Sequence, residues 1–183
     1  TVPNYLAGFV GKPVLPLDAP EVSAAIERVQ KRTDALLNCG GTHRPEWFHR
    51  KLGDILYEGC GVARDEAGLL DALTKVRELR EEFWRDVKVV GTGNRLNQEL
   101  EKAGRVADFI ELGEVMILDA LDRRESAGAH FRNEYATEAG EAKRNDDDWC
   151  AVSAWETRPD GTKVRHSEPL SFSLIDLQVR DYR

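Results

Sequence analysis

The sequence is 183 residues long, with 41% hydrophobic and 32% charged side chains and a formal net charge of −7. This length and apolar content suffice for one globular core, which argues against a disordered chain. The excess of acidic over basic side chains argues against nucleic-acid binding, because neutralising phosphates requires a basic face.

The cysteines and the hydropathy pattern bound the compartment. Cys39, Cys60 and Cys150 are odd in number and form no CxxC pair, so neither a disulfide framework nor a thiolate zinc site is expected. No apolar run approaches the roughly 18 residues of a membrane span, and the first residues lack the basic start of a signal peptide. We expect a soluble, cytoplasmic protein. Because the chain starts without Met inside apparently structured sequence, we expect a fragment of a longer polypeptide.

The first elements are a short helix, an extended arm and a long helix. Residues 1–17 combine several prolines and glycines with one apolar stretch, Tyr5–Val10, which predicts a short helix and then an arm. Asp18 is expected to cap the long helix, with Pro20 in its opening turn and Gly40 near its end. Its apolar residues recur at helical spacing and predict one buried stripe: Val22, Ile26, Val29, Thr33 and Leu36.

Three further helices follow the same period. They are expected to begin near Pro45, after a capping Asp65, and at Asn97, the last one running to about Arg124. The expected buried stripes are Phe48, Leu52, Ile55 and Leu56; then Leu69, Leu73, Val76, Leu79 and Phe83; then Leu100, Ala103, Val106, Ile110, Gly113, Ile117, Ala120 and Leu121. Long helices joined by short turns pack antiparallel. The prediction is a mainly α fold, an up-and-down helical bundle of the spectrin-repeat type.

After residue 133 the apolar period changes from about four to two. The segment 149–166 predicts a β-hairpin around Pro159-Asp160-Gly161, and residues 168–183 predict an extended tail. The expected organisation is a linker from a preceding region in residues 1–17, the helical bundle in 18–132, and the hairpin with its tail, packed on the bundle, in 133–183.

Motifs for catalysis are missing from the sequence. The loop Gly91-Thr92-Gly93 follows a helix and lacks a third glycine, so it predicts an interhelical loop and not a dinucleotide site. The four histidines show no metal-ligand spacing. Glu111 and Glu114 share a helical face with Asp108, which favours a solvated face over a carboxylate site. No catalytic, cofactor-binding or metal-ligating residue is assigned.

The most informative string is Arg123–Arg132, which closes the last long helix. Its small residues allow a sharp turn and close approach, so that its polar side chains could point into one interface. The expected docking residues are Arg124, Glu125, Ser126, Gly128, His130 and Arg132. Two alternatives stay open at this point. One is internal pairing of Arg123, Arg124 and Arg132 with Asp146, Asp147 and Asp148; the other is an acid/base enzyme that uses His130 with Glu125.

Several segments resemble the C-terminal helical domain of the flavoprotein subunit of succinate dehydrogenase and fumarate reductase. The resemblance is carried by Leu56–Ala63, Arg64, Leu73, Leu79, Glu82–Val87, Asn97, Glu99–Leu100, Glu111–Leu112 and, most specifically, Arg124–Arg132, with weaker likeness in Asn4–Ala7 and Glu168–Leu170. Ala127 stands where the family usually has Arg. Together with the insertion at residues 140–144, this departure resembles the bacterial branch that works with menaquinone.

The resemblance implies a division of labour within a larger subunit. The FAD site and the dicarboxylate-binding residues would lie in preceding flavin-binding and capping domains, and this region would be a structural docking domain without cofactor. The implied partners are those domains, an iron-sulfur subunit and, through it, a membrane anchor at the cytoplasmic face of the cell membrane. A free-standing helical interaction module is the alternative.

Overall fold

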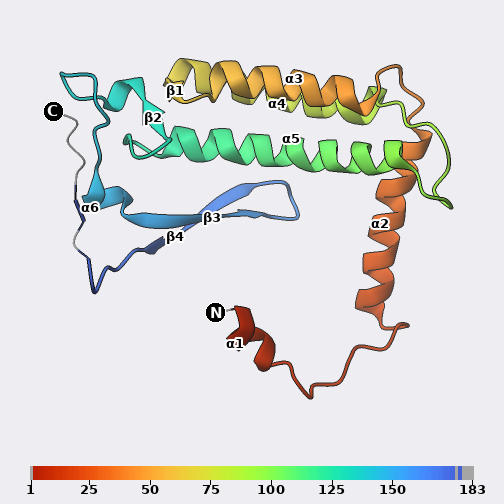
Figure 1. Cartoon of the computed structure of the whole chain (residues 1–183). Coiled ribbons are helices and arrows are strands. Elements are labelled where there is room, and N and C mark those ends of the chain that lie inside the picture. Colours follow the sequence, from red (N-terminus) through yellow and green to blue (C-terminus); the bar gives the residue numbers. More distant parts are fainter. Residues whose placement is uncertain (1, 176, 179–183) are drawn as a thin grey trace.

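The computed structural model describes residues 2–175 and 177–178. Helices dominate it, and two small pairs of strands complete it (Figure 1). The elements in chain order are α1 Val2–Ala7, α2 Pro20–Asn38, α3 Pro45–Gly59, β1 Ala63–Arg64, α4 Glu66–Asp86, α5 Gln98–Asp122, β2 Phe131–Arg132, a 3-10 turn Asn133–Tyr135, α6 Asp146–Trp149, β3 Ala151–Thr157 and β4 Lys163–Pro169. The mainly α prediction with a C-terminal hairpin is confirmed.

Helices α3, α4 and α5 form the antiparallel bundle and hold the core (Figure 1). Their predicted stripes lie inside it, since Phe48, Leu69, Val76, Phe83 and Ile117 are each fully buried. Phe48 and Phe83 meet edge to face across α3 and α4, with ring centroids 5.2 Å apart. The period of the apolar residues therefore predicted these three helices and their buried faces correctly.

Two of the predicted helix starts are confirmed and one is wrong. Asp65 accepts a hydrogen bond from the Gly68 amide at 2.8 Å, and Asn97 accepts one from the Leu100 amide at 3.1 Å. Helix α2 begins instead at Pro20 behind Ala19, without a side-chain cap. Asp18 is therefore not the cap, because the helix starts one residue later than the capping-box pattern requires.

Helix α2 does not lie along the bundle, although it was expected to bury its stripe there. Figure 1 shows it leaving the bundle end at a steep angle. Its C-terminal half contacts α5, where Arg32 donates to the Gly104 carbonyl at 3.1 Å and pairs with Asp108 at 2.5 Å. Leu36 is buried, but Ile26 and Val29 are 59% and 65% exposed. The stripe exists as a pattern, yet no described residue covers its N-terminal half.

Glycine fixes the turn between α2 and α3. A Cβ on Gly41 would lie 1.9 Å from the Asp86 carbonyl oxygen, so the loop backbone packs directly on the end of α4. Asp86 secures the loop by accepting hydrogen bonds from the Thr42 amide at 2.9 Å and from His43 at 2.5 Å. The direction of α2 depends on this contact.

The C-terminal strands β3 and β4 form the predicted antiparallel hairpin and run beside α5 (Figure 1). They join α5 through polar contacts: Trp155 Nε1 donates to Asp119 at 2.8 Å, Lys163 pairs with Glu111 at 2.9 Å, and Arg165 pairs with Asp122 at 2.7 Å. Past β4, residues 170–175 and 177–178 lie outside helices and strands. The rest of the expected tail falls outside the described residues.

No helix among the described residues is long and apolar enough to cross a membrane.

Candidate functional site

The string 123–132 turns back on itself at the end of the bundle where α5 finishes and α4 begins. The amide of Ala127 donates to the His130 carbonyl at 2.8 Å, and the His130 amide donates to the Ala127 carbonyl at 3.1 Å. Gly128 has φ +59°, a left-handed conformation that glycine adopts without strain. The turn brings β2 beside β1, where Phe131 is opposite Ala63 in a parallel pair.

Ser126 is fully buried and ties the two arms of this turn together. Its hydroxyl accepts a hydrogen bond from the Arg132 amide at 2.8 Å and donates to the Arg132 carbonyl at 3.1 Å. Its own amide donates to the Lys143 carbonyl at 2.9 Å, which draws in the following loop. The residue therefore serves the internal fold of the turn.

Arg132 links the end of α5 to the start of α4. Its side chain is only 3% exposed and donates to the carbonyl oxygens of Ala120 at 2.8 Å and Leu121 at 3.3 Å, in the last turn of α5. It also donates to Glu134 at 3.0 Å, and Glu134 in turn accepts from the Glu66 amide at 2.5 Å. A cation at a helix C-terminus and a carboxylate at a helix N-terminus both have the sign that the helix dipole favours.

Glu134 stays ionised over a wide pH range in this arrangement. Burial alone would raise the pKa of its carboxyl group, but hydrogen bonds from Arg132 and from the Glu66 amide outweigh that effect and lower the pKa. The two charges therefore support each other and both helix ends.

Glu125 is 2% exposed and its carboxylate is shared between two partners. One oxygen accepts from Arg123 Nε at 2.8 Å and Nη2 at 2.6 Å. The other accepts from the Asn145 amide at 2.9 Å, at the entrance to α6. A buried carboxylate with both oxygens bonded fixes the loop before α6 against the bundle.

His130 is half-buried and neutral in this environment. Burial lowers its pKa, and the positive charges of Arg64, Arg123 and Arg132 lower it further, against a hydrogen bond to the Arg123 carbonyl. Its Nε2 lies 3.1 Å from that carbonyl and its Nδ1 lies 3.5 Å from Arg64 Nη1. This geometry fits the neutral tautomer with its proton on Nε2. The partners of His130 do not include Glu125.

The string thus separates into buried and exposed members. Glu125, Ser126 and Arg132 are buried and His130 is half-buried, whereas Arg124 and Gly128 are exposed. The internal partners expected among Asp146, Asp147 and Asp148 are wrong: Arg123 pairs with Glu125, Arg132 with Glu134, and Asp146 with Arg144. Pairing is internal, but each of these arginines finds a carboxylate only two residues away.

The face of α5 expected to be solvated is partly buried. Glu114 is 3% exposed and pairs with Arg77 at 2.7 Å and Arg80 at 2.5 Å, both from α4. Burial alone would raise the pKa of Glu114, but these two arginines outweigh it and lower the pKa. The solvated prediction is wrong for this residue because α4 lies against that side of α5.

One group of potential metal ligands comes together only in space. His43, Glu82 and Asp86 offer ligand atoms within 4.8 Å of one another. No spacing in the sequence indicates this group, because His43 is remote from the other two. Asp86 already accepts hydrogen bonds from His43 and Thr42, which lower its pKa to about 2. These bonds account for the cluster as a fastening of the loop before α3.

Comparison with known proteins places this geometry in one family. Residues 49–182 match the family model described as fumarate reductase flavoprotein C-term. The succinate dehydrogenase flavoprotein subunit of Bacillus subtilis is 26% identical over 160 residues, which are 87% of this chain and 26% of that protein. The fumarate reductase flavoprotein subunit of Helicobacter pylori is 28% identical over 98% of this chain and 24% of its own length.

A solved structure supports the same assignment at the level of fold. Quinol fumarate reductase of Escherichia coli superposes with a TM-score of 0.76 at 24% identity, over 94% of this chain and 28% of that chain. The chain spans about a quarter of the length of these curated relatives. Since the family match covers most of the sequence, the chain belongs to the family of fumarate reductase flavoprotein C-terminal domains.

Proposed function

We propose that this chain is the structural C-terminal part of a flavin-dependent subunit that interconverts succinate and fumarate. The observation that carries the proposal is the family match over residues 49–182. The curated relatives are flavoprotein subunits of succinate dehydrogenase and fumarate reductase. In this proposal FAD and the dicarboxylate-binding residues belong to a preceding part of the polypeptide.

The internal contacts of the string agree with a supporting role. Its buried carboxylate and buried arginine are fully engaged with the bundle, with β2 and with the loop before α6. Side chains held this way stabilise a rigid end of the bundle and are not free to exchange protons with a substrate. The chemistry of the proposed subunit therefore falls outside this string.

We further propose that the subunit belongs to a membrane-associated complex. The relatives are named as subunits, which supports assembly with other chains. The proposed partners are an iron-sulfur subunit that takes electrons from the flavin and, through it, a membrane anchor, with the complex on the cytoplasmic face of the cell membrane.

The proposal is tested by comparing two proteins. The 183-residue chain should purify folded but colourless, and it should not oxidise succinate with a dye acceptor. The protein from the complete genomic reading frame should be yellow and active. Yellow, active 183-residue material would contradict the division of labour. A reading frame that starts just before Thr1 would contradict the proposal in favour of a free-standing helical interaction module.

The string contributes a docking prediction of its own, centred on exposed Arg124. This arginine lines a shallow depression together with Tyr135, Lys143 and Asp147. An exposed arginine fork suits carboxylates of a facing domain. Arg124→Ala should weaken association with a separately produced flavin-binding part while leaving the melting temperature of the 183-residue chain unchanged. Equal losses in both measurements would assign Arg124 to internal stability.

A further inference from the structure

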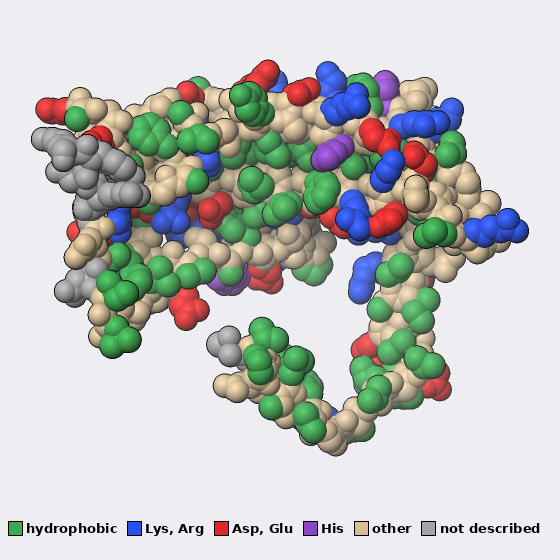
Figure 2. Space-filling model, in the orientation of Figure 1, with side chains coloured by type: hydrophobic (Ala, Val, Ile, Leu, Met, Phe, Trp, Pro, Cys, Tyr) green, Lys and Arg blue, Asp and Glu red, His purple; other side chains and the backbone are tan. Residues whose placement is uncertain are grey.

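The largest apolar surface of the molecule lies far from the string, on its N-terminal elements. Figure 2 shows hydrophobic side chains gathered over α1, the arm and α2. α1 has no buried residue. The large apolar side chains exposed in residues 2–29 are Val2, Tyr5, Leu6, Phe9, Val10, Val14, Leu15, Leu17, Ile26 and Val29.

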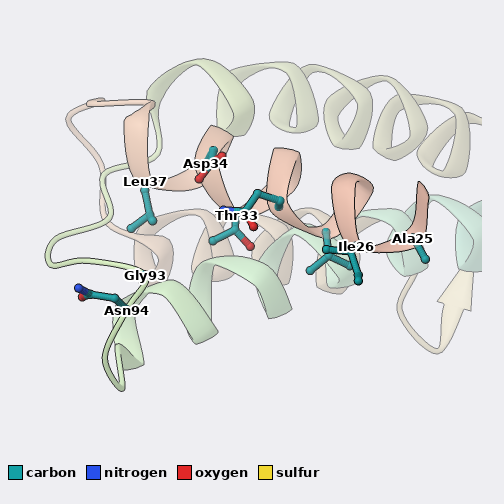
Figure 3. Close-up of a pocket in the computed structure, with 9 residues that line it drawn as sticks. Ala25, Ile26, Thr33, Asp34, Leu37, Gly93 and Asn94 are labelled. Atoms are coloured by element: carbon teal, nitrogen blue, oxygen red, sulfur yellow. The ribbon is translucent and has the colours of Figure 1, made fainter. Parts of the chain in front are cut away.

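The face of α2 continues this surface as a shallow groove. Ile26, Thr33 and Leu37 lie along one side of the helix, and the Gly93–Asn94 loop closes its end (Figure 3). The groove has a volume of about 730 Å³. A Cβ on Gly93 would lie 3.1 Å from Leu37 Cδ1, so the loop backbone packs directly against the helix. The groove is therefore built from two elements and is more than one row of side chains on a helix.

An uncovered helical stripe of this kind calls for a partner. A surface helix normally turns its apolar face to a core, and contiguous exposed apolar patches mark interaction sites. The position of α2 belongs to the shared fold, because the matched 94% of this chain is too large a share to leave all of α2 out. The exposed stripe thus lies on an element of the shared fold.

We propose that residues 2–37 form the surface on which the flavin-binding part of the same polypeptide docks. The inference rests on the proposed function. Its support is continuity: this surface lies on the N-terminal side of the family match at residues 49–182, and that family is described as a flavoprotein C-terminal region. In the proposed subunit, the remaining three quarters of the relatives' length precede this surface, next to α1 and the arm.

Charge favours a protein partner over a membrane surface. Residues 2–17 contain one charged side chain, Lys12. Anionic lipid surfaces attract clusters of lysine and arginine beside an apolar face, and this segment has no such cluster. A neutral apolar surface fits the interior boundary between two domains of one chain.

The first experiment follows hydrogen exchange in α2. We expect amides of residues 22–33 to exchange at least tenfold more slowly in the full-length subunit than in the 183-residue chain. The helix itself is present in both proteins, so added protection reports cover from the preceding part. Equal exchange in a yellow, active full-length subunit would overturn the docking inference while leaving the proposed function intact. A colourless, inactive full-length protein would contradict the proposed function instead.

A matched pair of variants tests the face itself. Ile26→Glu with Val29→Glu places two charges on the stripe, whereas Ser23→Glu with Ala24→Glu adds the same charge on exposed positions away from it. The first pair should lower the melting temperature of the full-length subunit and leave that of the 183-residue chain unchanged; the second pair should change neither. Equal behaviour of the two pairs in the full-length subunit would overturn the inference. If the first pair prevents folding, Ile26→Ser with Val29→Ser and the wild-type exchange data decide.

Two further measurements examine other occupants of the surface. A dimer of the full-length subunit that dissociates with Ile26→Glu and Val29→Glu would assign the surface to a second copy and overturn the proposal. Binding of the full-length subunit to vesicles of phosphatidylglycerol and phosphatidylethanolamine, lost in the same variant, would assign it to a membrane and overturn it likewise.

Discussion

At the scale of single residues, Arg132 is the side chain on which the end of the bundle depends most. Arg132→Ala leaves the Ala120 and Leu121 carbonyls and the Glu134 carboxylate without their donor. Breaking a buried ion pair from one side costs about 3–5 kcal/mol, and the partly exposed Glu134 places the expected loss near about 3 kcal/mol. Urea denaturation measures it. Arg132→Lys should lose less, and the exposed Arg124→Ala should stay within about 0.5 kcal/mol. Equal losses for Arg124 and Arg132 would contradict this role.

His130 predicts a pH dependence of stability. Its pKa in the folded chain is below the ordinary value of 6.5, so the unfolded chain binds more protons as the pH falls through that value. Stability should therefore decrease from pH 7 towards pH 5. His130→Gln, which retains an N–H donor for the Arg123 carbonyl, should show a smaller decrease in melting temperature over this range. An identical pH profile for both proteins would contradict the assignment.

The residue-level predictions from sequence succeeded for the character of the string and failed for its partners. A buried turn with Gly128 at its tip follows from small residues between ionisable ones. The choice of Glu125 and Glu134 as partners, over the acidic run at 146–148, depends on where β1 and the end of α5 lie. Those positions result from tertiary packing. No local spacing encodes them.

At the scale of elements, the α2–α3 connection sets the direction of α2. Gly41→Ala would place a Cβ 1.9 Å from the Asp86 carbonyl oxygen and force the loop to move. We expect a loss of more than about 2 kcal/mol in the free energy of unfolding. A Cβ on Gly53, inside α3, would meet no atom within 4 Å, so Gly53→Ala should stabilise the chain by about 0.5–1 kcal/mol. Chemical denaturation of both variants checks the contrast, and similar losses would contradict it.

The contrast between α2 and the other long helices explains what periodicity can predict. Stripes on α3, α4 and α5 are buried because these helices face one another along most of their length. The stripe on α2 has the same spacing, yet Ile26 and Val29 are exposed. An apolar period indicates that a helix face will be covered. Whether the cover comes from within 183 residues depends on the rest of the polypeptide.

At the scale of the whole molecule, the core begins only after the arm. Residues 2–18 contribute no buried side chain, whereas α3, α4 and α5 hold nearly the whole core. The segment before α2 should therefore behave as a separate unit in the 183-residue chain. Phe9, exposed just after α1, is expected to be cleaved early by chymotrypsin, because proteases cut exposed segments with few packing contacts.

Truncation and limited proteolysis together test this separation. A chain that begins at Val10 should melt at the same temperature as the intact chain, since no core residue is removed. Tyr57 serves as the internal control for proteolysis, because its side chain is 84% exposed but lies within α3 and should resist chymotrypsin under the same conditions. A lower melting temperature of the truncated chain would show that α1 packs on the bundle. In the full-length subunit, docking of residues 2–37 should slow cleavage at Phe9, so one region reports both the independence of the core and the cover over the arm.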